Sequence, residues 1–443
     1  MFVNLTKEQK QTIKLLSMGT FLVYFDLFLY AHMAILLNNV FFPPIHSNNQ
    51  SLLTAFGFCS SFVFRPLGAW LLGSIGDKYG RKVTIVITTV MMGIICLIIA
   101  FLPTYAQIGI QATWIILICR MLQEFASIGE LIGAQLLLSE TIPSPNRSRA
   151  VGILAVFAEL GGMAAIATVP LAIVYQFNWR IAFMVGACIA VVGAVARTKL
   201  RESPEFVDAN KKLKHSLKNV KQEPQPGAEN HFHKEPVNRK TAFAYFLIKC
   251  GGLAFLYFAF VYSANILKAN FSYNSYQILV HYLLLGIVQI VGWGLLRIYL
   301  STKIHPLKLL RFVWITISLF IPFLPWLLNH VTAPWQLLII QSFMVIFHPN
   351  DLPSISIFFK SFPVFKRFSS TSLLYATAYM IIYAITSFGI TYLIPYVGHG
   401  VLLILMVPVL IGYGYGLNHF KNLEKAAGRY PKLITREVRS TSD

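Results

Sequence analysis

Six ionisable residues lie inside long apolar stretches of the first half of the chain: Asp26, Arg65, Arg120, Glu124, Glu130 and Glu159. An ionised side chain is costly in the hydrocarbon of a bilayer, so it usually faces a cavity or a partner. A carboxylate that an arginine approaches and leaves can release and take up a proton. We predict proton coupling by Asp26 with one of Glu124, Glu130 and Glu159, driven by movement of Arg120. The alternative is a structural ion pair of Arg120 with Glu124 or Asp26.

Four polar residues of one apolar stretch fall on a single helix face. Arg120 and Glu124 are neighbours at i and i+4. At about 100° per residue, Gln123 and Glu130 lie roughly 60° and 80° round from Arg120 on the other side. The four residues span an arc of about 120°, which predicts one polar wall facing a central cavity.

Binding of a small charged molecule is the second chemistry that these residues allow. Arg65 and Arg120 present guanidinium forks suited to a carboxylate. Tyr24 and Tyr30 flank Asp26 and can line the same cavity or enclose a quaternary ammonium, although helix packing is the alternative. Asp351 lies between two prolines, near a break in its stretch. The predicted substrate-binding residues are Tyr24, Tyr30, Arg65, Arg120, Gln123 and Asp351.

The elements that position these residues must be membrane helices. Apolar residues make up 56% of the 443 residues and charged residues 12%, whereas about a quarter of a soluble protein is charged. Prolines predict kinks or register shifts in two of the spans, at 334–358 and 396–419. Twelve spans of about 20 residues are predicted, at 15–37, 51–75, 83–102, 112–138, 150–174, 179–196, 241–266, 276–300, 307–328, 334–358, 368–393 and 396–419.

The basic residues predict the orientation of these spans. With the N-terminus in the cytoplasm, the inside segments hold 32 lysines and arginines, while the outside loops hold only Arg180 and Lys268. We therefore expect an integral protein of the plasma membrane, in a bacterium the inner membrane, with both termini cytoplasmic.

One polar stretch divides the spans into six and six. The predicted domains are an N-terminal six-helix bundle at 1–196, a cytoplasmic central loop at 197–240, a C-terminal six-helix bundle at 241–419 and a cytoplasmic tail at 420–443. Residues 200–217 are expected to form an amphipathic surface helix. The predicted fold class is an all-α membrane protein of twelve transmembrane helices in two six-helix bundles.

The net charge of +20 is assigned to topology and lipid head groups, so no nucleic acid is expected as a partner. The five cysteines are odd in number and lack metal-ligand spacing, which predicts no metal site and no disulfide framework. No cofactor is expected, and the chain is expected to act as a monomer.

The segment from Gly73 to Lys82 matches the pattern G-x-x-x-D-[RK]-x-G-R-[RK], and resembles the signature loop of the major facilitator superfamily. Segments 64–68, 120–134, 178–183 and 200–206 resemble motifs of its metabolite:proton symporter family, whose members include proline/betaine, 2-oxoglutarate, citrate and shikimate carriers. The resemblance is specific over about residues 20–210.

The resemblance implies a cytoplasmic gate that holds an outward-open state. In it, Asp77 meets the positive end of a second-half helix and links through Arg81 to an acid and an arginine beyond span 4. The alternative is a purely topological anchor of positive charge. The implied gate residues are Gly73, Asp77, Gly80, Arg81, Lys82, Glu140, and Arg147 or Arg149.

Three departures from the family pattern concern coupling and substrate. The glutamate that precedes the equivalent of Asp26 is lost, Glu124 replaces a glycine, and the loop at 297–303 has no acid. The resemblance implies secondary active transport by alternating access, with proton-coupled uptake of a small carboxylate or zwitterion such as proline, betaine or a di- or tricarboxylate. The alternatives are a proton-antiport exporter and a non-transporting membrane receptor derived from a carrier. An enzyme is not expected, because no nucleophile, metal or phosphate-loop constellation is present.

Overall fold

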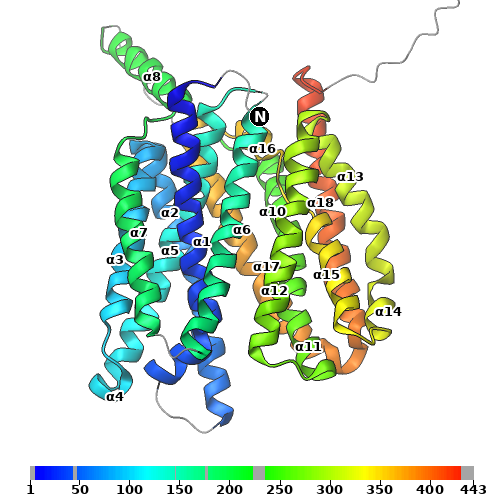
Figure 1. Cartoon of the computed structure of the whole chain (residues 1–443). Coiled ribbons are helices and arrows are strands. Elements are labelled where there is room, and N and C mark those ends of the chain that lie inside the picture. The colour runs from blue at the N-terminus through cyan, green and yellow to red at the C-terminus, as the bar shows by residue number, and fades with distance from the viewer. Residues whose placement is uncertain (1–4, 43–46, 145, 175–177, 223–234, 431–443) are drawn as a thin grey trace, which may run out of the picture.

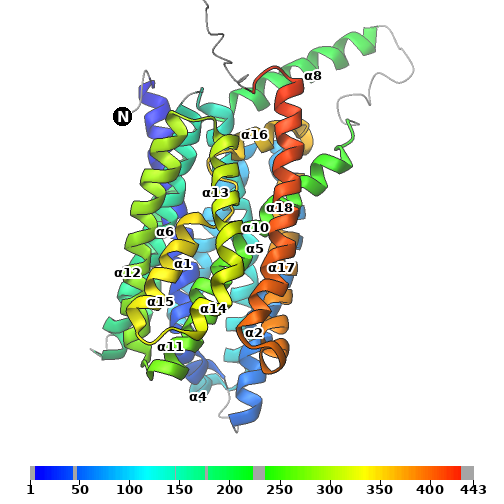
Figure 2. The ribbon, with the colours of Figure 1, turned by 90° about the vertical axis from the view of Figure 1, so that its right-hand side faces the viewer.

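The computed structural model describes residues 5–42, 47–144, 146–174, 178–222 and 235–430, and within these ranges the chain is helical without strands. Figure 1 shows the helices of the first half on the left and most of those of the second half on the right, with their axes running roughly from top to bottom. Figure 2 shows the second half face on.

The helices of the first half are α1 (Lys7–Phe41), α2 (Ser47–Tyr79), α3 (Arg81–Phe101), α4 (Tyr105–Ile108), α5 (Ile110–Thr141), α6 (Asn146–Val174) and α7 (Trp179–Thr198), followed by α8 (Pro204–Gln222). Turn and capping residues fix several of their starts. Thr6 and Gln9 form a capping box at α1, and the Asn178 side chain accepts from the backbone of Arg180 at α7. The amphipathic helix expected at 200–217 is confirmed by α8.

The second half contains α10 (Arg239–Tyr257), the π-helical turn η2 (Phe258–Tyr262), α11 (Ser263–Phe271), α12 (Ser275–Trp293), the π-helical turn η3 (Gly294–Tyr299), α13 (Pro306–Phe320), α14 (Leu324–Asn329), α15 (Pro334–Phe347), α16 (Ile355–Lys360), α17 (Arg367–Val397) and α18 (Val401–Ala426). Short 3-10 turns at 300–302, 321–323, 364–366 and 398–400 connect them. Proline in the first turn suits α13 and α15, since the missing N–H has no partner there.

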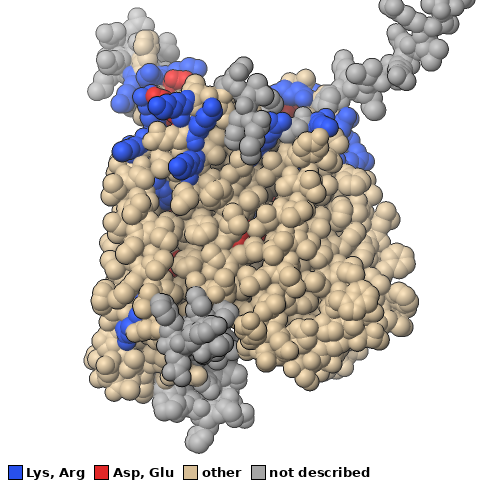
Figure 3. All heavy atoms as spheres, in the orientation of Figure 1, with Lys and Arg blue, Asp and Glu red and all other residues tan. Residues whose placement is uncertain are grey.

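Nine helical segments of the described residues are long and apolar enough to cross a membrane. The remaining crossings are α2, α5, which carries Arg120, Glu124 and Glu130 in its middle, and the shorter α15. The chain is therefore an all-α membrane protein of twelve spanning helices in two six-helix bundles, as predicted. Figure 3 shows lysine and arginine gathered at the end where α1 begins, which we call the basic end.

The structure corrects two predicted spans. The span expected at 334–358 is divided, because α15 ends at Phe347 and α16 begins only at Ile355. Pro349 and Pro353 lie in the gap, where they remove backbone donors and restrict the preceding residues. The last helix, α18, continues to Ala426 beyond its predicted end at 419, and residues 431–443 of the predicted tail lie outside the described residues.

Helices α1 and α6 cross closely at a glycine. A Cβ atom added to Gly161 would lie 2.1 Å from the carbonyl oxygen of Phe21, whereas one added to its neighbour Gly162 would first meet a Phe28 ring atom at 3.5 Å. The backbones at Gly161 thus leave no room for a side chain, and close packing of this kind lets membrane helices associate.

Gly161→Ala is therefore expected to lower the free energy of unfolding by about 1–3 kcal/mol, because it overpacks the crossing. Gly162→Ala, one residue away with ordinary van der Waals space, is the matched control. The midpoint of thermal unfolding in detergent measures both variants. Equal midpoints for the two would contradict the assigned crossing.

Candidate functional site

A cavity of about 600 Å³ lies between the two halves. Helices α1, α2, α5 and α6 line it from the first half, and α10 to α12, the segment between α15 and α16, and α17 line it from the second. Along α1 it extends from Thr20 to Asn38, and Phe42 beyond the end of α1 also lines it, so it reaches toward the end opposite the basic end. The lysine, arginine and carboxylate residues among its described lining are Arg65, Arg120, Glu124, Glu159, Lys249 and Asp351.

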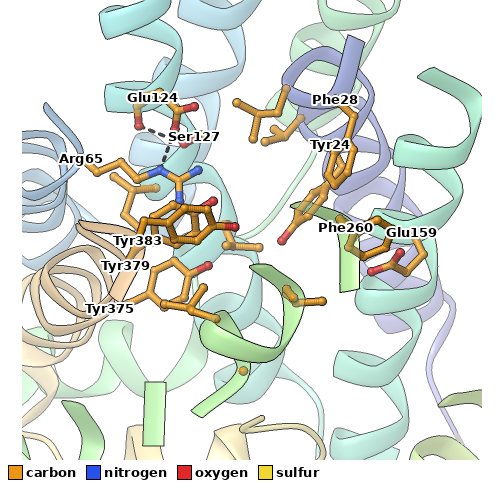
Figure 4. A pocket seen from close by; sticks show the side chains of 18 of the residues that line it. Tyr24, Phe28, Arg65, Glu124, Ser127, Glu159, Phe260, Tyr375, Tyr379 and Tyr383 are labelled. Atoms are coloured by element: carbon orange, nitrogen blue, oxygen red, sulfur yellow. Dashed lines mark hydrogen bonds and ion pairs between the residues drawn. The ribbon is translucent and has the colours of Figure 1, made fainter. Parts of the chain in front are cut away.

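Glu124 is the centre of the charged wall of the first half. Its Oε2 lies 2.6 Å from Arg65 Nε, and its Oε1 lies 3.5 Å from Arg120 Nη2. The two guanidinium groups also lie over tyrosine rings, Arg65 over Tyr379 and Arg120 over Tyr30, each 3.8 Å from the ring centroid. One carboxylate thus faces two cations, which leaves this wall net positive and suited to a ligand carboxylate. Figure 4 shows Arg65 between Glu124 and the tyrosines of α17.

Asp26 lies behind this wall and does not line the cavity. Gln123 connects the two, because its Oε1 accepts from Arg120 at 2.7 Å and its Nε2 donates to Asp26 Oδ2 at 2.6 Å. The thiol of Cys96 donates to the other oxygen of Asp26 at 3.0 Å. The predicted polar wall is therefore wrong for Gln123, which links Arg120 to Asp26 instead of facing a ligand.

The predicted polar wall is also wrong for Glu130. This carboxylate is fully buried away from the cavity, 2.5 Å from Arg197 Nη2, and it accepts from Thr88 and Thr89 at 3.1 and 3.0 Å. Its face of α5 packs against α3, so its neighbours are threonines instead of the cavity. Arg197, expected in the central loop, is the buried penultimate residue of α7.

Glu159 lies on the opposite wall of the cavity from Arg65, beside Phe260 (Figure 4). Within the part of the chain that the structure describes, its carboxylate has no hydrogen bond or ion pair. Tyr24 and Tyr30 line the cavity, as expected, and so does Asp351.

Sequence reasoning missed two parts of the lining. Tyr375, Tyr379 and Tyr383 follow each other at four-residue intervals on α17, and the rings of the last two stack with centroids 4.4 Å apart. The regular spacing was the available signal, since residues at i and i+4 share a helix face. Lys249 of α10 is the second omission, and a lysine inside an apolar span was its signal.

The gate residues form a network at the basic end. Asp77 Oδ1 accepts from the backbone N of Phe368 at 2.9 Å, and its Oδ2 accepts from Ser369 N at 2.8 Å and Ser369 Oγ at 2.6 Å. These donors belong to the first turn of α17, where the helix dipole favours a negative charge. The structure therefore joins the halves where the resemblance places the gate.

Three further predicted gate residues lie in α2, in α3 and in the turn between them. Gly73 lies against α17, since an added Cβ would come within 2.6 Å of Ser369 Cα, and Gly80 has a φ of +112° at the turn between α2 and α3. Lys82 donates to the carbonyl of Thr198 at 2.7 Å. The turn and the close approach both require glycine.

Glu140 forms ion pairs with two arginines of this network. It lies 3.1 Å from Arg81 Nε and 2.7 Å from Arg367 Nη1, and Arg367 also reaches Glu205 of α8 at 2.8 Å. Arg367 of α17 thus binds the acid for which an arginine beyond α5, Arg147 or Arg149, was expected. Arg147 lies in the first turn of α6, and its Nε donates to the carbonyl of Ile142 at 2.8 Å.

A charged cavity between two six-helix bundles, closed at one end by an ion-pair network, defines a membrane carrier. The sequence profile of the Major Facilitator Superfamily matches residues 16–385. The chain belongs to the major facilitator superfamily, and it is not an enzyme.

Relatives and solved structures agree with this assignment. The proline/betaine transporters of Salmonella typhimurium and Escherichia coli are each 34% identical over 206 residues, which cover 44% of this chain and 41% of theirs. The chain thus spans less than half the length of these curated relatives, and they confirm the expected resemblance. The proton:xylose symporter XylE has a TM-score of 0.70 at 14% identity, covering 96% of both chains. The human organic anion transporter MFSD10 has a TM-score of 0.58 at 14% identity, covering 94% of this chain and 99% of its own. These two structures show the fold.

Asp77→Asn is expected to lower the initial rate of transport about tenfold and to change KM by a smaller factor. Hydrogen bonds to a charged acceptor contribute about 1.5–3 kcal/mol, and the variant weakens those made by the first turn of α17. Asp208→Asn, which removes an exposed carboxylate of α8, is the matched control. Initial rates measured in proteoliposomes decide, and equal rates for the two variants would remove the gate assignment.

Proposed function

We propose that the chain is a secondary active transporter that takes up a small zwitterion or carboxylate together with protons by alternating access. The observation that carries the proposal is the cavity, which lies between the halves and holds ionisable groups at membrane depth. The two moving halves are residues 1–196 and 241–419, connected by the loop at 197–240, and the chain acts as a monomer.

The balance of charge supports a substrate class. Three cations, Arg65, Arg120 and Lys249, face three carboxylates, Glu124, Glu159 and Asp351, among the described lining residues. A di- or tricarboxylate would meet as many acids as bases, whereas a zwitterion such as proline or a betaine can satisfy both. The names of the proline/betaine relatives agree with this choice.

The tyrosines of the cavity favour a substrate with an ammonium group, including a methylated one. Tyr24, Tyr375, Tyr379 and Tyr383 all line the cavity. Aromatic faces attract ammonium groups and tolerate methylated ones, which have no donors to satisfy.

The proposed direction is uptake. The basic end is the cytoplasmic side of the plasma membrane, because lysine and arginine gather there, and α18 ends on that side. The Asp77 network closes this end, while the cavity reaches the level of Phe42 near the other. A substrate thus enters from outside.

The proton sites are Glu159 and Asp26, with different surroundings. Glu159 lines the cavity without an arginine partner among the described residues, so a proton can reach it from the aqueous side. Gln123 connects Asp26 with Arg120 through two hydrogen bonds. Movement of Arg120 or of Gln123 changes the field at Asp26 and so its affinity for a proton.

A panel of compounds tests the function as a whole. The purified protein is placed in liposomes that contain a pH-sensitive dye, and amino acids, betaines and organic acids are added one at a time without an imposed gradient. Acidification of the lumen by a zwitterion supports symport of that class. Silence across the panel with folded protein would overturn proton-coupled uptake and favour export or a receptor.

Asp26→Asn and Glu159→Gln are each expected to abolish proton-driven accumulation of substrate, because the amide that replaces the carboxylate does not take up a proton near neutral pH. Exchange of labelled for unlabelled substrate should continue in at least one of them, since exchange needs no net proton movement. Uptake with and without an inward proton gradient measures the loss.

Glu130→Gln is the comparison variant, since it removes a carboxylate placed against Arg197 outside the cavity. It is expected to reduce the amount of folded protein, because breaking a buried ion pair is strongly destabilising. Loss of proton dependence in this variant alone would contradict the assignment of Glu159 and Asp26.

A further inference from the structure

A second ion pair lines the cavity from the other half of the molecule. Lys249 Nζ of α10 donates to Asp351 Oδ2, and both side chains are largely buried, 5% and 13% exposed. The lysine ammonium lies 4.8 Å from the centroid of Tyr375. The pair therefore places a cation and an anion side by side in the wall of the second half.

Asp351 reaches the cavity because the chain leaves helical geometry there. Residues 348–354 form no helix between α15 and α16. Non-helical backbone at membrane depth is tolerated where it is buried in protein or lines a cavity, and broken helices supply the binding sites of several transporter folds. His348, Asn350, Asp351 and Leu352 all line the cavity.

One arginine satisfies the freed backbone of this break. Arg297, 3% exposed in η3, donates through Nη2 to the carbonyl oxygens of His348 at 2.7 Å and Ile346 at 3.2 Å. Its Nη1 donates to Leu352 O at 3.3 Å and to the Asn350 side chain. From the other side, the hydroxyl of Tyr413 donates to Asn350 O at 2.5 Å. The segment that carries Asp351 is thus held in a single position.

The two ion pairs of the cavity meet on one helix. Arg65 lies over Tyr379 and Lys249 near Tyr375, and the centroids of these two rings are 6.1 Å apart on α17. The first pair comes from α2 and α5 and the second from α10 and the break. Charged groups from both halves are thereby neighbours in the same cavity.

We propose that Lys249 and Asp351 form a substrate subsite, in which a zwitterion replaces the internal ion pair, and that Arg297 is the positioning residue of this subsite. The proposal rests on the proposed function and adds the residues that bind the carboxylate and the ammonium group of the substrate. A substrate carboxylate takes Lys249 and a substrate ammonium takes Asp351, so one internal pair is exchanged for two with the ligand. The empty cavity keeps both charges neutralised until then.

The double variant Lys249→Met/Asp351→Asn separates this role from a structural one. Removing both members of a buried pair is often neutral for stability, whereas removing one leaves an uncompensated charge. We expect the double variant to keep a wild-type midpoint of thermal unfolding and to raise KM about tenfold or more, the effect of a lost charge-assisted contact. The probes are radiolabelled L-proline and glycine betaine, taken up by the full chain in proteoliposomes.

Two outcomes overturn different statements. Wild-type protein that takes up neither probe overturns the proposed zwitterion uptake, and with it the exchange at this pair. Wild-type uptake with an unchanged KM in the double variant overturns the subsite alone and leaves the proposed function standing.

Choline tests which charged group of the substrate Lys249 binds, since choline has the quaternary ammonium of glycine betaine without the carboxylate. Wild-type protein should be inhibited far better by unlabelled glycine betaine than by choline, and Lys249→Met should narrow this ratio about tenfold or more. An unchanged ratio contradicts a contact between Lys249 and the carboxylate.

Arg297→Lys tests the positioning role, because lysine keeps the charge and loses the planar fork of donors. We expect a higher KM for the same probes with kcat within about twofold of wild type. A lower amount of folded protein with unchanged KM would assign Arg297 to structure only.

Discussion

The cost of an ionised group in an apolar interior governs the arrangement of this molecule. Arg65 and Arg120 share Glu124, Arg197 joins Glu130, and Lys249 joins Asp351. Each pair comes from segments distant in sequence or from successive turns of one helix, so charge neutralisation also fixes which helices are neighbours. Glu159, with no such pair among the described residues, stands out against this pattern. In the proposed subsite, the pairing in the cavity is exchangeable, because a ligand can supply the missing charge.

Features that depend on local sequence pattern were predicted from the sequence. Features that depend on which helices pack against each other were not. Apolar runs and the distribution of lysine and arginine predicted twelve spans, and the segment from Gly73 to Lys82 predicted the superfamily. Helical periodicity gave the face of Glu130 correctly but not what that face meets, because periodicity contains no information about α3 and α7. The ion pair of Arg197 with Glu130 was not predicted, because Arg197 lies at the end of a span and was assigned to the central loop. The break before Ile355 was only partly predicted, since prolines allow a kink, a register shift or a gap.

The two halves use comparable positions for different purposes. At the end of α2, Asp77 binds the first turn of α17, and at the start of α3, Arg81 pairs with Glu140 of α5, which also binds Arg367 of α17. After α12, the segment 297–303 has no acid, and Arg297 in η3 binds the backbone between α15 and α16. The charges of the first half thus form a contact between the halves. The arginine of the second half instead holds the non-helical segment that carries Asp351.

Helix α17 touches both ends of this system. Its first turn binds Asp77. About two to three turns further on, roughly 10–16 Å along a rigid helix, the rings of Tyr375 and Tyr379 contact two of the cavity's cations, Lys249 and Arg65. Thermodynamic linkage between two such sites is reciprocal. A ligand that binds more tightly to one position of α17 must change the stability of the Asp77 contact by the same factor by which that contact changes the ligand's affinity. In the proposed transport cycle, the Asp77 contact is thereby a determinant of affinity, although it touches no ligand.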